Sequence, residues 1–121
     1  MTSWTARKNA ACPAGVAGYP SGSGVALSGS GKVVNQAALV TRGPAVTSQS
    51  YYGLTFVNDG SITATLNNAN EYTVGYIGTI TNNGAITALN GNGVDVGSRL
   101  TNTGTITASG LAVSGYGALI N

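Results

Sequence analysis

The sequence has no histidine, one cysteine, one methionine and only three acidic residues, Asp59, Glu71 and Asp95. Charged residues make up 7% of the chain, whereas a typical globular domain carries about 25%. The usual general bases, imidazole metal ligands and nucleophilic triads are therefore missing. We expect a protein that is not an enzyme and that uses no cofactor and no metal ion.

Basic residues are also few, and they are scattered along the chain. The formal net charge is +2. The basic residues are Arg7, Lys8, Lys32, Arg42 and Arg99. Because nucleic-acid binding needs a basic stripe that neutralises phosphates, no nucleic-acid partner is expected.

The single cysteine and the N-terminal segment say little about compartment. Cys12 cannot close a disulfide within the chain, and no zinc-ligand spacing surrounds it, so a buried small residue and an interchain disulfide both stay open. The first 25 residues lack the apolar core of a secretory signal. No uninterrupted 18-residue apolar stretch predicts a transmembrane helix, so membrane insertion is not expected. The chain is either complete and made inside the cell, or a piece of a longer exported protein.

The sequence does contain an internal repeat. Gly, Thr, Asn and Ser fill 57 of the 121 positions, and much of this bias comes from the pattern apolar-x-Asn-x-Gly-x-Ile-Thr-Ala. Copies recur at intervals of 19–24 residues, at 33–41, 56–64, 80–88 and 100–108, with a new start at 119–121. A shorter apolar signature precedes them, at 25–27, 44–46, 72–74, 94–96 and 111–113.

The repeat has the alternation of a β-strand with a turn at its centre. Its apolar, Asn, Gly, Ile and Ala positions share parity, so an extended chain presents them on one face. Asn-x-Gly favours a tight corner because both residues tolerate positive φ. A unit of about 20 residues cannot bury its own apolar face and must stack on its neighbours. Stacking predicts two interior columns, namely Leu39, Ile62, Ile86 and Ile106 in one and Val33, Phe56, Ile80, Leu100 and Leu119 in the other.

Stacking also predicts a ladder of asparagine side chains. Its members are Asn35, Asn58, Asn82, Asn102 and Asn121. At a strand spacing of about 4.8 Å, each amide can hydrogen-bond to the next. Helix is disfavoured because helical apolar spacing is absent and each interior Gly would cost about 1 kcal/mol. The predicted fold class is all-β: a parallel β-solenoid, or β-helix, of four to five coils over 24–121, preceded by an irregular cap or attachment segment, 1–23.

The runs at 78–88 and 100–108 carry a family resemblance. They resemble the repeats of bacterial autotransporter passenger domains and related surface β-helix adhesins, and similar Gly/Asn/Thr-rich stacking occurs in phage tail and fibre proteins. The resemblance covers about 65 residues, from Phe56 onward. It implies a rigid, low-charge, non-catalytic rod for display, adhesion or assembly. The signal peptide and C-terminal membrane domain of a complete autotransporter are not recognisable, so we expect a fragment or another solenoid.

Three smaller motifs point to chemistry that the rest of the sequence does not support. The segment 91–96 fits half of a calcium-binding nonapeptide. The positions aligned with Asp95 in the other copies are Ala26, Ala45, Thr73 and Ala112, so we interpret Asp95 as a solvent-facing residue. The segment 29–32 resembles part of a phosphate loop, but Val33 stands where Ser or Thr would bind magnesium, which favours a coil corner. No aligned column holds the two carboxylates that polysaccharide hydrolysis requires.

Four tyrosines predict a contact surface. Tyr52 and Tyr76 each precede a column residue by four positions, which places them on one wall of adjacent coils, with Tyr51 and Tyr116 nearby. Tyrosine offers contact area at low entropic cost. These side chains either only cover the adjoining part of the coil, or contact a glycan or another subunit.

The residues Leu119, Ile120 and Asn121 start a further coil and form a candidate assembly end. An open terminal coil exposes strand edges and apolar columns to water. We therefore expect a non-enzymatic structural subunit of a multi-copy exposed assembly, either a virion tail or head-decoration protein or an extracellular fibre. Its partners would be copies of itself or other structural subunits. The alternative is an adhesin or glycan-binding fragment of an autotransporter-like surface protein.

Overall fold

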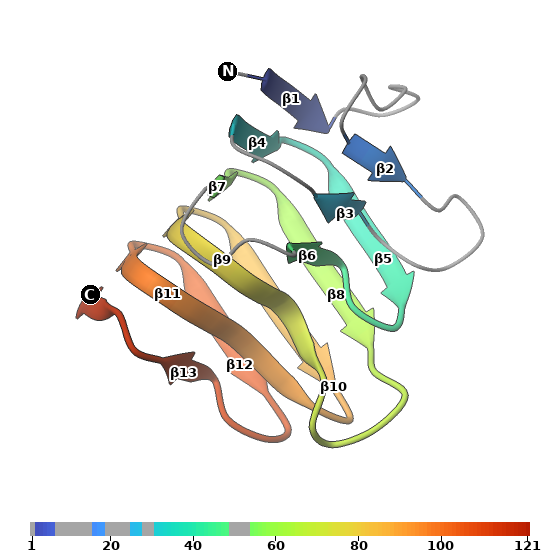
Figure 1. Cartoon of the computed structure of the whole chain (residues 1–121). Helices are drawn as coiled ribbons and strands as arrows, with labels where there is room; N and C mark the ends of the chain where they lie inside the picture. The colour runs from blue at the N-terminus through green and yellow to red at the C-terminus, as the bar shows by residue number, and fades with distance from the viewer. Residues whose placement is uncertain (1, 7–15, 19–24, 28–30, 49–53) are drawn as a thin grey trace.

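The fold is a stack of successive turns of β-strand. A computed structural model describes residues 2–6, 16–18, 25–27, 31–48 and 54–121. Within these ranges the regular elements are all strands, and with one exception neighbouring strands run parallel (Figure 1). The protein is therefore an all-β parallel β-solenoid of about four turns, as the repeat predicts.

The described strands are short in most turns and long in two of them. They are β1 (Thr2–Ala6), β2 (Val16–Gly18), β3 (Val25–Leu27), β4 (Gly31–Asn35), β5 (Ala38–Arg42), β6 (Val46–Ser48), β7 (Leu54–Asn58), β8 (Ser61–Thr65), β9 (Tyr72–Asn82), β10 (Ala85–Leu89), β11 (Asn92–Asn102), β12 (Thr105–Ala108), β13 (Val113–Gly115) and β14 (Ala118–Ile120).

These strands form two sheets with the hydrophobic core between them (Figure 1). The larger sheet has the order β1-β4-β7-β9-β6-β3-β2, with β11 beside β9 and with β13 and β14 beside β11. The smaller sheet has the order β12-β10-β8-β5. In the turns of β9 and β11, one 11-residue strand replaces the two short strands of the earlier turns. Both long strands therefore pair with two strands of a neighbouring turn.

Both predicted interior columns are present and in register. The first runs Val33, Phe56, Ile80, Leu100 and Leu119. The second runs Leu39, Ile62, Ile86 and Ile106. Consecutive members are strand partners, and the side chains in the middle of each column are fully buried. This confirms the prediction that each turn buries its apolar face against the next.

The segment 1–23, for which the sequence predicts irregular structure, contains the strands β1 and β2. Strand β1 pairs in parallel with β4, so that Trp4 takes the register position of Val33, while β2 pairs antiparallel with β3. Thr and Trp favour strands. The repeat pattern does not detect β1 because no Asn-x-Gly corner follows it. Stacking therefore begins before the recognisable repeat.

The repeat glycines allow close stacking of the corners. Gly60, Gly84 and Gly104 do not have the positive φ that the Asn-x-Gly pattern suggests. Instead, a Cβ atom at Gly84 would collide with the carbonyl oxygen of Gly60 in the preceding turn, and one at Gly104 with that of Gly84. The amide of Gly84 also donates to the carbonyl oxygen of Asn58 at 3.0 Å. A side chain at these positions would separate backbones that are in direct contact.

Replacing Gly84 by alanine is expected to lower the free energy of unfolding by about 1–3 kcal/mol, because the new methyl group must push two turns apart. Gly75→Ala is the matched control, since a Cβ there would make only an ordinary contact, 3.4 Å from the Cβ of Tyr72. Urea unfolding of the two variants measures the difference. Equal stabilities would show that the corner backbones are not closely stacked.

Candidate functional site

The predicted asparagine ladder is continuous through the described turns. The Nδ2 of Asn35 donates to the Oδ1 of Asn58 at 2.8 Å, and Asn58 donates to Asn82 at the same distance. Asn82 in turn donates to Asn102 at 2.8 Å, and Asn102 to Asn121 at 3.0 Å. The structure thus brings together all five asparagines, with each side chain donating in the same direction.

Backbone carbonyls complete the hydrogen bonding of the ladder. The Nδ2 of Asn58 also donates to the carbonyl oxygen of Ala85 at 3.1 Å, and that of Asn82 to Thr105 at 3.2 Å. Buried amides therefore have partners on both sides, as buried polar groups require. Among the described residues, Thr73 Oγ1 is the one buried side-chain polar atom without a hydrogen-bond partner. The ladder lets a polar residue occupy the interior of every turn.

The three acids lie in different environments. Asp59 is exposed and accepts a hydrogen bond from the Nδ2 of Asn83 at 2.7 Å. Asn83 then accepts from the hydroxyl of Thr103 at 2.9 Å, which forms a second polar ladder on the surface. Glu71 accepts from the backbone amide of Asn67 at 2.8 Å. Both carboxylates have structural partners, and the third, Asp95, lies in the pocket described below.

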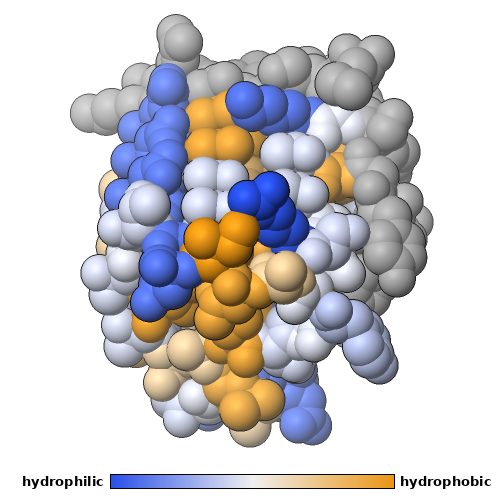
Figure 2. All heavy atoms as spheres, turned by 90° about the vertical axis from the view of Figure 1, so that its left-hand side faces the viewer, coloured by the Kyte–Doolittle hydropathy of each residue, from blue (hydrophilic) through white to orange (hydrophobic). Residues whose placement is uncertain are grey.

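The candidate assembly end is exposed and apolar. Leu119 is 56% exposed, whereas Leu100, its partner in the preceding turn, is completely buried. Ile120 and Leu111 are also exposed. Figure 2 shows a band of hydrophobic side chains that reaches the lower end of this face, the end at which the C-terminus lies in Figure 1. Asn121 is exposed as well and forms the last rung of the ladder.

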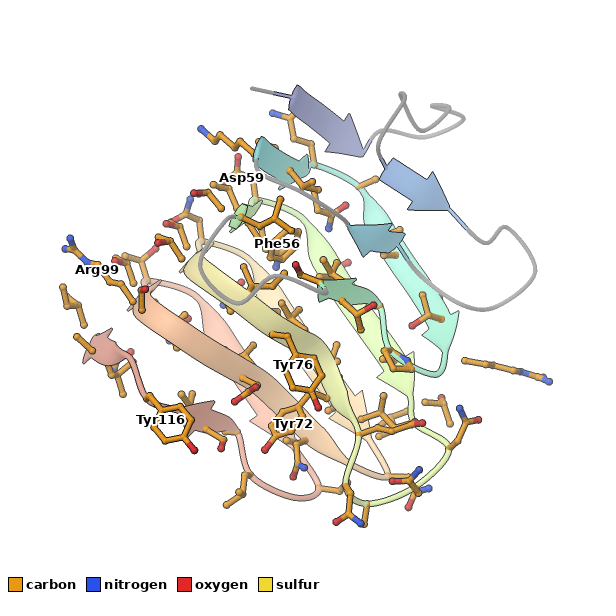
Figure 3. The ribbon with its side chains drawn as sticks, in the orientation of Figure 1. Phe56, Asp59, Tyr72, Tyr76, Arg99 and Tyr116 are labelled. Carbon is orange, nitrogen blue, oxygen red and sulfur yellow. The ribbon has the colours of Figure 1, made fainter. Side chains whose placement is uncertain are left out.

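Three tyrosines lie on one side of the solenoid, across β9, β11 and β13 (Figure 3). Tyr76 and Tyr116 belong to the predicted contact surface, and both are exposed. Tyr72 joins them, although its place in the short signature suggested only an apolar strand position. Tyr51 and Tyr52, also predicted here, lie outside the described residues, as does Cys12.

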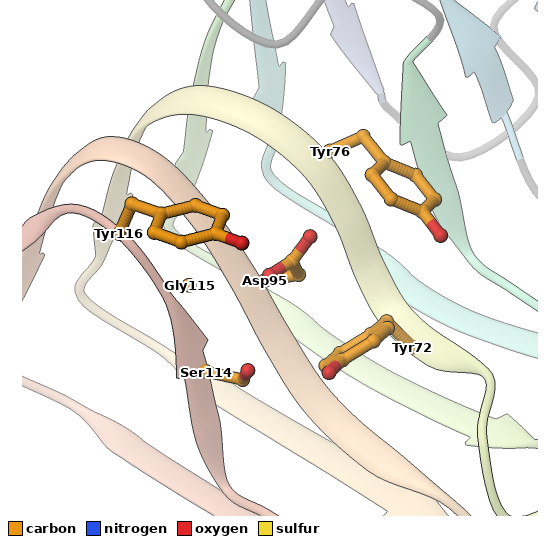
Figure 4. Close-up of a pocket in the computed structure, with 6 residues that line it drawn as sticks. All are labelled: Tyr72, Tyr76, Asp95, Ser114, Gly115 and Tyr116. Atoms are coloured by element: carbon orange, nitrogen blue, oxygen red, sulfur yellow. The ribbon is translucent and has the colours of Figure 1, made fainter.

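These tyrosines line a pocket of about 400 Å³. The other described residues of its lining are Asp95, Ser114 and Gly115. In Figure 4, Asp95 lies between the three aromatic side chains, with the hydroxyls of Tyr72 and Tyr116 turned toward the space beside it. We call this site the tyrosine pocket. It draws its residues from three successive turns, because Asp95 is the register partner of Ser114 and Tyr72 that of Asn92.

The position of Asp95 corrects two expectations from the sequence. It is not solvent-facing, because only 4% of its surface is exposed. Its register partner in the next turn is Ser114 and not Ala112, since Val94 pairs with both Val74 and Val113. The aligned signature is therefore displaced by two residues. In an alternating apolar-x-apolar motif such a displacement preserves the buried face, so hydrophobicity alone could not identify the register.

A bulge in β9 places Tyr76 at the pocket. Between Val94 and Val96 on β11 there is one residue, whereas two residues separate their partners Val74 and Ile77 on β9. Tyr76 occupies this bulge with a φ of 61°. A left-handed conformation is unusual for a bulky residue, and bulges often redirect a side chain. No sequence signal of positive φ marks this position, since it is not Gly, Asn or Asp.

The remaining motifs gain no ligand set from the geometry. Among the described residues, no group of three or more His, Cys, Asp or Glu side chains is placed to hold a metal ion. Lys32, the end of the segment that resembles a phosphate loop, lies exposed within strand β4. In the part of the chain that the structure describes, there is also no helix of the length and hydropathy needed to cross a membrane.

The fold places the chain in the structural class of parallel β-solenoids. Comparison with protein-family models, with curated proteins and with solved structures gives no significant match. The functional argument therefore depends on the exposed end and the tyrosine pocket of this chain.

Proposed function

We propose that the protein is a non-enzymatic structural subunit of a multi-copy exposed assembly, such as a virion tail or head-decoration protein or an extracellular fibre. In this proposal, the coil that contains Leu119, Ile120 and Asn121 stacks against a neighbouring subunit. The main support is the exposure of an interior column at this coil: Leu119 is open to solvent, while Phe56, Ile80 and Leu100 of the same column are fully buried.

The edge strands of this coil are suited to pairing. Among the described strands, β13 and β14 pair only with β11, and β12 only with β10. Natural proteins commonly protect such edges with charged residues, especially lysine. Residues 101–121 contain no charged side chain. A neighbouring strand could therefore add to the sheet without burying a charge.

A stacked neighbour would continue the contacts that already join the turns. It would cover Leu111, Leu119 and Ile120, and full burial of an aliphatic side chain contributes about 1.5–3 kcal/mol. It could also extend the ladder at Asn121, whose side chain accepts from Asn102. The same combination of apolar column and amide ladder that holds the turns together would then hold the subunits together.

We expect the 121-residue chain to form concentration-dependent oligomers at micromolar concentration and Leu119→Lys to shift them to monomers. The lysine would place a charge in the proposed interface, where burial is costly. Val40→Lys is the matched control, because Val40 is an exposed aliphatic residue on β5, away from the terminal coil. Analytical ultracentrifugation measures both. A monomeric wild-type chain, or equal dissociation by both substitutions, would contradict the proposal.

An adhesin or glycan-binding fragment is the second candidate, and the tyrosine pocket is the observation that favours it. Aromatic rings with a few convergent polar groups are typical of ligand pockets. This candidate predicts a stable monomer whose ligand affects Tyr72, Tyr76 and Tyr116 but leaves the terminal coil unchanged. The same ultracentrifugation experiment therefore separates the two candidates.

A further inference from the structure

The tyrosine pocket has a negative group at its centre. Asp95 is the one charged side chain among the described residues of the lining, which otherwise consists of tyrosine, serine and glycine. Only 4% of the Asp95 surface is exposed. Charges attract more strongly where protein excludes water, because the effective dielectric constant is lower. The pocket should therefore favour cationic groups and disfavour anionic ones.

Asp95 retains the capacity to bind a ligand while it is engaged within the protein. Both Asp95 and Tyr76 have contacts in the folded chain. The two oxygens of a carboxylate offer about four acceptor positions, so a carboxylate can serve several donors at once. An ammonium group has three N–H donors and no acceptor. It matches a carboxylate that is flanked by hydroxyl oxygens.

The tyrosines add a second kind of attraction for a cation. The face of an aromatic ring is electronegative and attracts an ammonium group within about 6 Å of its centre. Tyr72, Tyr76 and Tyr116 surround Asp95 on several sides (Figure 4). Tyr116 is 90% exposed, which leaves the pocket accessible from solvent. Phenol oxygens and ring faces are therefore both available beside the carboxylate.

The backbone of β9 holds Tyr76 in this arrangement. Its φ of 61° is unfavourable for a bulky residue, and the bulge interrupts the register between β9 and β11. Such conformations persist where the surrounding structure fixes them, and they are frequent at ligand sites. A glycine at this position would adopt the same φ without strain. The presence of tyrosine is thus better explained by its side chain than by its backbone.

We propose that the tyrosine pocket binds an organic ammonium group, R–NH₃⁺, with Asp95 as its counter-ion and the three tyrosines as its walls. A volume of about 400 Å³ can hold a small amine or an amino sugar. The ammonium group could come from an amino sugar or from an aliphatic amine such as a lysine side chain. This site is distinct from the terminal coil face of the assembly proposal, because it does not involve Leu119, Ile120 or Asn121.

Paired probes that differ in charge test the proposal. Glucosamine and propylammonium are the cationic probes, and glucose and N-acetylglucosamine are neutral counterparts of the amino sugar. We expect glucosamine to bind at least about tenfold more tightly than either neutral sugar, and its affinity to fall as sodium chloride is added. Propylammonium distinguishes the sources: binding as tight as that of glucosamine indicates recognition of the amine alone, and weaker binding indicates an amino sugar. Titration followed by NMR of the tyrosine rings measures each affinity.

Substitutions identify the groups responsible. Asp95→Asn keeps the shape and removes the charge, and should weaken glucosamine binding about tenfold or more. Asp59→Asn removes the same charge from an exposed position outside the pocket and should leave binding unchanged. Tyr116→Ala tests the wall at a position too exposed to affect folding, and should also weaken binding. Equal affinity for glucose and glucosamine, no binding of either cation at millimolar concentration, or full binding by folded Asp95→Asn or by Tyr116→Ala would overturn the proposal.

Discussion

Replacing Asn82 by leucine is expected to lower the free energy of unfolding by about 3 kcal/mol or more, although the side chains have similar size. The amide of Asn82 accepts from Asn58 and donates to Asn102, both at 2.8 Å, and it donates to the carbonyl oxygen of Thr105. All three interactions disappear with leucine. Buried donors and acceptors on both neighbouring turns then lose a partner, and each such loss costs about 1–3 kcal/mol.

The surface ladder supplies the control for this prediction. Asn83 is adjacent in sequence and also bonds to both neighbouring turns, through Asp59 and Thr103, but it is exposed. Because water can replace these hydrogen bonds, Asn83→Leu should change stability by about 0.5 kcal/mol or less. Urea unfolding monitored by circular dichroism gives both values. Similar losses for the two variants would mean that the interior ladder contributes no more than exposed hydrogen bonds.

Truncation of Phe56 to alanine is expected to destabilise the fold by about 3–5 kcal/mol. Phe56 is the one phenylalanine of the chain and is completely buried. It lies between Val33 and Ile80 in the first interior column. Its removal would leave a cavity at the middle of a stack, and turns on both sides are held apart by backbone hydrogen bonds that limit collapse into the space.

Two variants make this measurement specific. Phe56→Leu retains most of the volume and should cost about 1.5 kcal/mol or less. Val40→Ala removes exposed apolar surface on β5 and should be nearly neutral. Thermal and urea unfolding provide the comparison. A loss of less than about 1 kcal/mol for Phe56→Ala would indicate that the column is loosely packed.

The parts of the fold that the sequence predicts are those in which two signals coincide. Residues such as Phe56 and Ile80 carry the apolar alternation, while Asn58 and Asn82 fix the position of the corner two residues later. A displacement of one residue would turn every apolar side chain outward. The asparagine then excludes a displacement of two. Columns, ladder and parallel stacking all follow from this agreement.

The tyrosine pocket could not be derived in the same way because its region lacks the second signal. The motif around Val94 and Val96 alternates without a fixed asparagine, so two registers are equally hydrophobic. The bulge that turns Tyr76 toward Asp95 depends on pairing between turns, and tyrosine does not favour its φ. The corner glycines show a related limit, since the close contact of Gly84 with Gly60 involves residues 24 positions apart.

The uniform direction of the asparagine ladder has a consequence for the length of such a molecule. Every turn donates to the next with the same atoms, so turns 82–102 and 58–82 are joined by equivalent bonds. Insertion or deletion of one whole turn would restore the same contacts and change the length of the rod by about 4.8 Å. Duplication of a single genetic segment of this size could therefore adjust the reach of the rod in equal steps, without redesign of its interior.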